Sequence, residues 1–236
     1  MKITDKAVLV TGANRGLGRA LVEEALSRGA QRVYAGTRQP LSHADARVTP
    51  LTLDVTNAAQ IQAALEHVAS LDILVNNAGL ALFDDLSDRA SLERHLAVNF
   101  FGPYGVTQAF LPLLGGSGGG ALVNVLSVAA LAPLPMIAGY SISKAAAFSW
   151  TQSLRALLAG QGISVHAVLA GPIDTDMTRG FEIPKSTPES VARAILDGVE
   201  RGDEDIFPDP MSAAMAESWS SGAAKSLERQ NAALVQ

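Results

Sequence analysis

The chain of 236 residues contains no cysteine and has no excess of basic residues. Without cysteine there is no disulfide framework and no catalytic thiolate, and the net charge of −5 argues against a nucleic-acid surface, which is normally basic. The histidines show no spacing typical of metal ligands. They are His43, His67, His95 and His166. We therefore expect no metal site and no nucleic-acid partner.

A second absence is local, because no Asp, Glu, Lys or Arg occurs from His95 through Ser143. This stretch does not read as a membrane span, since Pro112, Pro133, Pro135 and the cluster "GGSGGG" interrupt it, whereas a span needs about 20 continuous apolar residues. The N-terminus "MKITDKAVLV" carries three charges and is not a signal peptide. We therefore expect no membrane partner and a cytoplasmic location.

Short apolar runs alternate with longer amphipathic segments along the chain. Strands are expected at "AVLVTG", "RVYAG", "VTPLTLD", "DILVNN", "ALVNVLS", "SVHAVLAG" and "DIFPD", and helices at about 17–28, 57–68, 91–114, 140–159 and in "TPESVARAILDGVERG". Continuously apolar strands separated by helices indicate a parallel sheet covered on both faces. The sequence predicts one doubly wound, Rossmann-type α/β domain over residues 1–236, with about seven parallel strands. The polar segment 211–236 is expected to be a loosely docked tail helix.

The first turn, "VTGANRGLGRA", is rich in glycine. Gly12, Gly16 and Gly18 follow a predicted strand and open a helix, which leaves backbone N–H groups free to meet a pyrophosphate. The spacing Gly-x-x-x-Gly-x-Gly differs from the usual dinucleotide fingerprint, and glycine turns also occur for steric reasons. The turn alone indicates a nucleotide site without establishing one.

The stretch "GYSISKAAAF" places Tyr140 four residues before Lys144, on one face of a predicted helix. A free phenol ionises near pH ~10, and a nearby cation lowers that pKa. From Arg94 to Ile173 there is no Asp or Glu, so Lys144 has no local acid for a surface ion pair. The pair predicts a phenol tuned for proton transfer, although the same spacing also arises by chance.

Several motifs occur together in a familiar order. They are "TGANRGLG", "LDV" at 53–55, "NNAG" at 76–79, Asn99, Ser127 in "NVLS", "YSISK" at 140–144 and "GPIDT" at 171–175. This set resembles the short-chain dehydrogenase/reductase family, and the resemblance extends to about residue 210. It implies an oxidoreductase of the carbonyl reductase or alcohol dehydrogenase type, which interconverts a ketone or aldehyde and an alcohol by hydride transfer.

The resemblance implies a catalytic set of Asn99, Ser127, Tyr140 and Lys144. Tyr140 would be the general acid and base, and Ser127 would hydrogen-bond the substrate oxygen. Lys144 would lower the pKa of Tyr140 and hold the nicotinamide ribose. Asn99 would bind a water that links Lys144 to solvent, unless its side chain makes only a hydrogen bond inside the helix.

The implied cofactor contacts follow the same motifs. They are Gly12, Gly16 and Gly18 at the phosphates, Asn14, Arg15 and Leu17 in the same turn, Asp54 and Val55 at the adenine, Asn76, Ala78 and Gly79 at the ribose, Ile173 and Thr175 at the nicotinamide amide, and Tyr140 with Lys144. Ala170 stands where the family usually has proline, so a less rigid turn is expected before Ile173.

The cofactor is predicted to be NADP(H) in preference to NAD(H). An NAD site of this kind uses an acid at the end of the second strand to bind the ribose hydroxyls. Here "VYAGTRQP" has none, since no Asp or Glu occurs between Glu24 and Asp45. Arg38 stands where a 2′-phosphate would lie, and Arg15 is a second candidate, although either arginine can also be a solvated surface side chain.

The sequence also suggests the partners. The segment between Ser127 and Tyr140 has no charged side chain, so a small-molecule carbonyl or alcohol substrate with apolar bulk is expected. Met177, Phe181 and Ile183 are expected to form a lid over the substrate. Residues 95–114 have no charged side chain and the helix 140–159 has only two, so both outer faces suit a second subunit and predict a homodimer or homotetramer.

Two other classes of protein remain open. The stretch "GGSGG" at 115–119 matches the Gly-x-Ser-x-Gly motif of hydrolases, but it precedes a predicted strand, and no acid lies between Ser117 and His166. The second alternative is a non-catalytic nucleotide-binding regulatory protein on the same fold. Such a protein would typically lack one of the four catalytic groups, all of which are present here.

Overall fold

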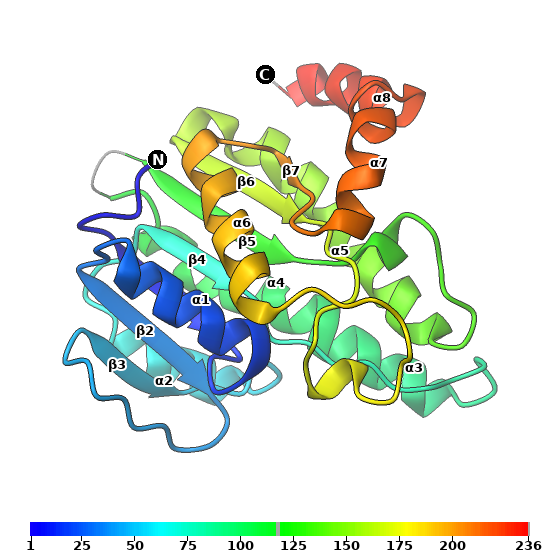
Figure 1. Ribbon diagram of the computed structural model, residues 1–236. Coiled ribbons are helices and arrows are strands. Elements are labelled where there is room, and N and C mark those ends of the chain that lie inside the picture. The colour runs from blue at the N-terminus through cyan, green and yellow to red at the C-terminus, as the bar shows by residue number, and fades with distance from the viewer. Residues whose placement is uncertain (117–118, 236) are drawn as a thin grey trace.

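A computed structural model describes residues 1–116 and 119–235. Its centre is one sheet of seven parallel strands (Figure 1). The strand order is β3-β2-β1-β4-β5-β6-β7. The strands are β1 (Ala7–Thr11), β2 (Arg32–Thr37), β3 (Val48–Thr52), β4 (Ile73–Asn76), β5 (Gly120–Val125), β6 (Ile163–Val168) and β7 (Asp205–Ile206). The predicted doubly wound α/β architecture is confirmed. Ser117, from the hydrolase-like stretch, lies outside the described residues.

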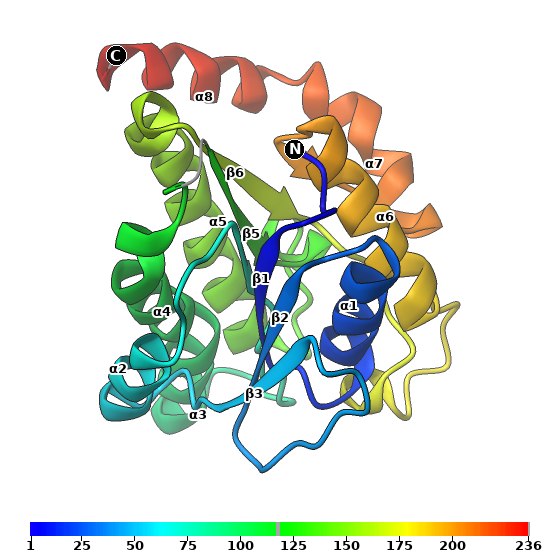
Figure 2. The ribbon, with the colours of Figure 1, turned by 90° about the vertical axis from the view of Figure 1, so that its left-hand side faces the viewer.

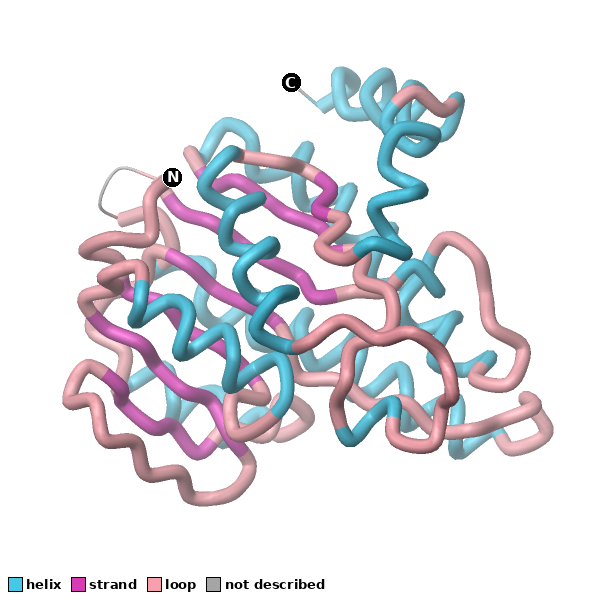
Figure 3. Tube along the Cα trace, in the orientation of Figure 1, coloured by secondary structure: helices cyan, strands magenta, loops and turns pink. Residues whose placement is uncertain are grey.

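Helices cover both faces of this sheet (Figures 2 and 3). They are α1 (Gly16–Ser27), α2 (Ala58–Glu66), α3 (Arg89–Leu96), α4 (Gly102–Phe110), α5 (Ala138–Leu158), α6 (Pro188–Arg201), α7 (Pro210–Ser220) and α8 (Ala223–Ala232). Figure 2 shows α1 and α6 on one side of the sheet and α2, α4 and α5 on the other. Within the described residues, no helix is both long enough and apolar enough to cross a bilayer.

The hydrophobic core is divided by the sheet into two layers. Alternation along β1 sends Val8 and Val10 into the layer beneath α1 and α6, and Leu9 into the opposite layer beneath α4. All five residues of β1 are buried, as expected for a central parallel strand. Burial of each large aliphatic side chain contributes about 1.5–3 kcal/mol, so the strands form a stiff platform for the loops at their ends.

The strand order creates a switch point between β1 and β4. β1 pairs with β2 on one side and with β4 on the other, because the chain first builds outward to β3 and then returns. Ligands of open α/β sheets bind in the crevice at the carboxyl ends of strands at such a point. The two strands that border this crevice end at Thr11 and Asn76.

The long helical segment expected at 91–114 is continuous, but its helix type changes along its length. α3 is followed by a π-helical turn, Ala97–Phe101, and then by α4, whose second residue is Pro103. The chain also passes close to Val55 here, because a Cβ on Gly102 would lie 2.7 Å from its Cγ2. The π turn contains Asn99, and turns of this kind are frequent at functional sites.

The C-terminal segment forms α7 and α8, which are attached through charge. The ammonium of Lys225 is buried and lies 2.8 Å from Asp205 and 3.0 Å from Glu228. Arg155 of α5 also pairs with both of these acids. This network joins α8 to the end of α5 and to β7.

Candidate active site

The loop after β1 has the shape of a phosphate cradle. Gly12 and Gly16 have φ angles of +68° and +51°, which side-chain-bearing residues rarely adopt. A Cβ on Gly18 would lie 2.1 Å from the carbonyl oxygen of Gly12, so only glycine permits this turn. Among the described residues, no side chain caps the N-terminus of α1 at Arg15. The amide groups there fit the pyrophosphate of a dinucleotide.

The loop after β4 is tied to this cradle through Asn77. Its side-chain amide donates a hydrogen bond to the carbonyl oxygen of Thr11 (2.9 Å), and the Thr11 hydroxyl accepts from the backbone N–H groups of Asn77 and Ala78 (3.0 Å each). Asn77 is not among the cofactor contacts expected from the sequence, although it stands inside the "NNAG" motif. These bonds close the floor of the crevice between β1 and β4.

Asn76, predicted to line the ribose side of the cofactor, is buried and bonded within the protein. Its side chain is only 3% exposed, and its amide donates to Thr107 and to Asn124 at 2.9 Å each. Asn124 in turn donates to Thr151 of α5. Neighbouring residues of a strand point to opposite faces, so Asn76 points toward α4 and α5 while Asn77 points toward the cradle. The amide nitrogen of Asn76 therefore joins β4 to α4 and β5, and the contact of this residue with the cofactor ribose stays a prediction.

The predicted adenine side has an ordered acid. The carboxylate of Asp54 accepts hydrogen bonds from the backbone N–H and hydroxyl of Thr56 (2.9 and 2.7 Å). The Thr56 backbone bond is the main cause that lowers the pKa of Asp54, and the positive charge of Arg38 adds to it. Arg38 is thus near Asp54, exposed and directly after β2. Val55 is buried beside them.

The second candidate arginine, Arg15, has another partner. Its guanidinium lies 2.8 Å from the carboxylate of Asp176 in the loop after β6. The same loop packs on the cradle, since a Cβ on Gly16 would lie 3.0 Å from Cγ2 of Thr175. Arg15 therefore joins the two loops that face each other across the crevice, and Asn14 is exposed next to it. Leu17 points instead into the core.

The turn that begins at Ala170 is held without proline. Ala170 is buried, and the N–H of Gly171 donates to the carboxylate of Asp209 at 2.7 Å. Ile173 pairs with Ser186 through a single parallel bridge, which closes the following loop on itself. These bonds restrain the backbone that carries Ile173 and Thr175.

Ser127, Tyr140 and Lys144 come together where β5 ends and α5 begins. Ser127 lies beside the Tyr140 hydroxyl and caps a short helical turn by accepting from the N–H of Ala129 (3.1 Å). The ammonium of Lys144 lies 5.7 Å from the centre of the Tyr140 ring and donates to the carbonyl oxygen of Val125 at 2.8 Å. In the described part of the chain, Lys144 makes no ion pair with a carboxylate.

Burial dominates the proton affinities of this cluster. It raises the pKa of Tyr140, and the neighbouring Ser127 hydroxyl acts in the opposite direction. This net direction differs from the lowered pKa expected from the sequence, because enclosing a phenol in protein disfavours its anion. Burial also lowers the pKa of Lys144 to about 8. Tyr140 is therefore a protonated donor at neutral pH, and Lys144 is close to its titration range.

Asn99 faces this cluster from the π turn. Its side chain accepts from the N–H of Leu80 and donates to the carbonyl oxygen of Leu80, both at 2.8 Å, and it also donates to the hydroxyl of Ser143 at 2.9 Å. The side chain therefore connects the loop after β4 with α5. A Cβ on Gly79 would lie within 3.8 Å of both Asn99 and Lys144, so this glycine lies between them.

An aromatic pair joins the loop after β4 to the loop after β6. Phe83, from the loop after β4, stacks on Phe181 with ring centres 5.4 Å apart and planes inclined by 21°. Met136 and Met177 are also exposed on the neighbouring loops. Phe83 was not found from the sequence, since its partner is almost 100 residues away and no local pattern marks the pair.

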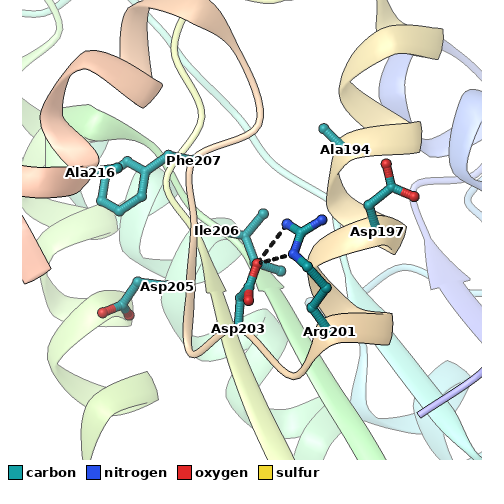
Figure 4. A pocket seen from close by; sticks show the side chains of 8 residues that line it. All are labelled: Ala194, Asp197, Arg201, Asp203, Asp205, Ile206, Phe207 and Ala216. Atoms are coloured by element: carbon teal, nitrogen blue, oxygen red, sulfur yellow. Dashed lines mark hydrogen bonds and ion pairs between the residues drawn. The ribbon is translucent and has the colours of Figure 1, made fainter.

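A cavity of about 280 Å³ lies elsewhere, where β7 begins between α6 and α7 (Figure 4). Figure 4 shows Arg201 and Asp203 pointing toward each other, and their charged groups are 2.6 Å apart. This end of β7 is the amino end of the sheet. The cavity is therefore separate from the crevice at the carboxyl ends.

Comparison with known proteins agrees with this geometry. The sequence profile of the short chain dehydrogenases matches residues 6–185. An uncharacterized oxidoreductase of Staphylococcus epidermidis is 32% identical, over 83% of this chain and 91% of its own. The ketoacyl reductase HetN of a Nostoc species is 30% identical, over 87% of this chain and 79% of its own. A solved short chain dehydrogenase from Burkholderia cenocepacia, in complex with NADP, is 37% identical with a TM-score of 0.88 over 98% of both chains.

Proposed function

The chain belongs to the short-chain dehydrogenase/reductase family of hydride-transferring oxidoreductases, and we propose that it uses NADP(H) to interconvert a ketone or aldehyde and an alcohol. The observation that carries this proposal is the grouping of Ser127, Tyr140 and Lys144 at the end of β5, beside the crevice whose other wall is the glycine cradle. A donor, an orienting hydroxyl and a cation are the groups that carbonyl reduction requires.

In the direction of reduction, Tyr140 donates its proton to the carbonyl oxygen while the carbonyl carbon receives a hydride. A bound nicotinamide supplies that hydride. The raised pKa keeps Tyr140 protonated before the step. Ser127 holds the substrate oxygen by a hydrogen bond that strengthens as negative charge develops. Lys144, protonated below pH about 8, stabilises the tyrosinate left behind.

The preference for NADP(H) rests on the end of β2. Thr37 is followed by Arg38 and Gln39, so no acid is present to bind the 2′-hydroxyl of NAD. Arg38 is exposed and near Asp54, on the predicted adenine side, whereas Arg15 is paired with Asp176. Arg38 is therefore the arginine that we assign to the 2′-phosphate. The related Burkholderia cenocepacia enzyme, which was solved with NADP, supports the same preference.

The substrate is proposed to carry apolar bulk next to its carbonyl. The stacked pair Phe83 and Phe181 and the exposed Met136 and Met177 supply aromatic and thioether surface around the crevice. Side chains of this kind favour aryl and alkyl groups over phosphate or carboxylate groups. A strong preference for charged substrates would contradict this assignment.

A homo-oligomer is proposed from the face formed by α4 and α5. Phe101, Tyr104 and Leu157 are 59%, 44% and 60% exposed, and Tyr104 joins an aromatic cluster with Phe100 and Trp150. A two-fold axis would bury this face against its copy. Light scattering should give a mass of at least two chains, and Tyr104→Glu should reduce it. A wild-type mass near the 24.5 kDa of one chain refutes the oligomer.

The function is tested by mixing the protein with NADPH and a panel of aryl and alkyl ketones and aldehydes, and by following the loss of NADPH absorbance. Turnover with at least one carbonyl compound is expected. Binding of NADPH without turnover of any carbonyl compound would favour the non-catalytic nucleotide-binding alternative.

A further inference from the structure

Two buried titratable side chains, Asp84 and His95, lie beside the catalytic cluster and have no part in the proposed mechanism. The side chain of Asp84 is 5% exposed and that of His95 is fully buried. Asp84 belongs to the loop after β4, and His95 belongs to α3. Both contact the backbone immediately before Tyr140, so their relation to α5 needs an explanation.

Asp84 caps the helix that carries Tyr140. Both of its carboxylate oxygens accept from the backbone N–H of Gly139, at 3.0 and 3.1 Å. The residue at the N-cap position itself, Ile137, has no side-chain acceptor to offer. The cap therefore comes from a residue 55 positions earlier in the chain. A carboxylate at a helix N-terminus is favoured by the helix dipole and by the charge of the bond.

The segment that presents Asp84 is itself held at alternate residues. Leu80 is bonded through its N–H and its C=O to Asn99, and the N–H of Leu82 donates to Nε2 of His95 at 3.0 Å. The N–H of Asp84 then donates to the carbonyl oxygen of Met136. His95 and Asn99 are four residues apart, so one helical stretch anchors this segment twice before it reaches α5.

His95 has one protonation pattern that satisfies both neighbours. Its Nδ1 lies 2.9 Å from the carbonyl oxygen of Ser91, which requires a proton on that nitrogen, and its Nε2 accepts from Leu82. A Cβ on Gly139 would lie 2.8 Å from this ring and 3.1 Å from the Asp84 carboxylate. The start of α5 is thus packed directly on Asp84 and His95, with no space for a larger residue.

The other side of Tyr140 is held as well. Its carbonyl oxygen accepts from the hydroxyl of Ser143 at 2.7 Å, and that hydroxyl accepts from Asn99. The backbone of Tyr140 therefore lies between two fixed points, Asp84 before it and Asn99 after it. A general acid must stay within about 2.6–3.2 Å of the atom it protonates, so both restraints bear on the position of the phenol.

We infer that Asp84 is a positioning residue for Tyr140, and that His95 holds the segment that presents it. This inference rests on the proposed function, because positioning matters only if Tyr140 is the acid. Asp84 does not touch the reacting atoms. It determines where the first turn of α5 begins and hence where the hydroxyl of Tyr140 lies relative to Ser127.

The test compares Asp84→Ala and Asp84→Asn with Asn57→Ala. Asn57 is a matched control, because its side chain also caps a helix, α2, by accepting from the N–H of Gln60, but α2 carries neither a residue of the catalytic cluster nor one that holds the segment of Asp84. Asp84→Ala should lower kcat about tenfold to hundredfold, as expected for a small displacement of a reacting group, with the NADPH dissociation constant unchanged. Asp84→Asn keeps an acceptor for Gly139 and should restore kcat to within about threefold of the wild type. Asn57→Ala should retain full kcat.

Hydrogen exchange of the amides in 137–144 provides a second measurement that needs no substrate. Asp84→Ala should accelerate this exchange, whereas Asn57→Ala should affect only α2. Unchanged exchange in Asp84→Ala, or loss of kcat in Asn57→Ala equal to that in Asp84→Ala, would overturn the inference. If the wild type reduces no carbonyl compound, the proposed function fails, and the exchange result still decides whether Asp84 holds the start of α5.

Discussion

Two helices, α1 and α5, begin at the same edge of the sheet, but of these two only the N-terminus of α5 is capped by a side chain in the described part of the chain. At α1, the described residues offer no side-chain cap, so the backbone N–H groups are free to meet a ligand anion. At α5, the carboxylate of Asp84 already occupies the equivalent position on Gly139. A helix N-terminus carries about half a positive charge, so the first attracts phosphate and the second is neutralised by the protein.

The difference separates the crevice into two ends with distinct chemistry. The α1 end is built largely from backbone, with glycines that allow close approach. The α5 end is built from the side chains of Ser127, Tyr140 and Lys144, with apolar residues around them. An anionic cofactor and a neutral carbonyl substrate would each find one suitable end. Four variants or conditions test this division, from the largest expected effect to the smallest.

Tyr140→Phe should abolish most carbonyl reduction at the α5 end and leave NADPH binding at the α1 end intact. Loss of a general acid typically costs about 10²–10⁴-fold in rate, so kcat for carbonyl reduction should fall by that order. The NADPH dissociation constant, measured by fluorescence, should stay within about twofold because the hydroxyl is no major cofactor anchor. Near-normal turnover at neutral pH would show that another group is the acid.

Gly18→Ala should have the converse effect, a loss of NADPH affinity at the α1 end. The added Cβ would collide with the carbonyl oxygen of Gly12, and such overpacking costs about 1–3 kcal/mol, which corresponds to a dissociation constant for NADPH about fivefold to 150-fold higher. Gly160→Ala is the control, since a Cβ there meets nothing within 4 Å. Equal NADPH affinity in both variants would show that the glycine turn after β1 is not part of the cofactor site.

Arg38→Ala should weaken the preference for NADPH over NADH at the α1 end of the crevice. A hydrogen bond to a charged group is worth about 1.5–3 kcal/mol, so the ratio of kcat/KM for NADPH to that for NADH should fall about tenfold or more. Arg32→Ala serves as the control, because Arg32 is exposed at the other end of β2 and bonds Thr49. If the wild type prefers NADH, the assignment of Arg38 is wrong.

The smallest effect is a dependence on pH at the α5 end. Burial lowers the pKa of Lys144 from 10.5 to about 8, so kcat for reduction at pH 8 should be about half its value at pH 6.5, as the cation beside Tyr140 is lost. Lys144→Arg should shift this decline to higher pH, because a guanidinium stays protonated. A flat profile through pH 9 would exclude a catalytic need for the charge.

The same titration affects stability in the opposite direction. Between pH about 8 and 10.5 the folded protein has released the Lys144 proton while the unfolded chain still binds it. The contribution of Lys144 to the free energy of unfolding therefore rises over that range. Denaturant titrations of the wild type and Lys144→Met at pH 7 and pH 10 measure this difference.

Much of the fold and part of the candidate site could be predicted from the sequence. Continuous apolar strands, helices between them and the glycine turn after β1 are local patterns, and chain geometry converts them directly into a parallel sheet with a cradle at its edge. The spacing of Tyr140 and Lys144 is also local, since residues four apart on a helix share one face. Each of these features needs only the period of its own element.

What the sequence by itself determined was therefore the elements, their order and the residue types available for chemistry. Only the tertiary structure decided that Asn77 and not Asn76 faces the cradle, that Arg15 pairs with Asp176, and that Asp84 caps α5. It also decided the direction in which the pKa of Tyr140 shifts, because that shift depends on burial in the surrounding protein. The physical reason is the same in each case: these contacts join segments distant in the chain or depend on burial, and no local period encodes either.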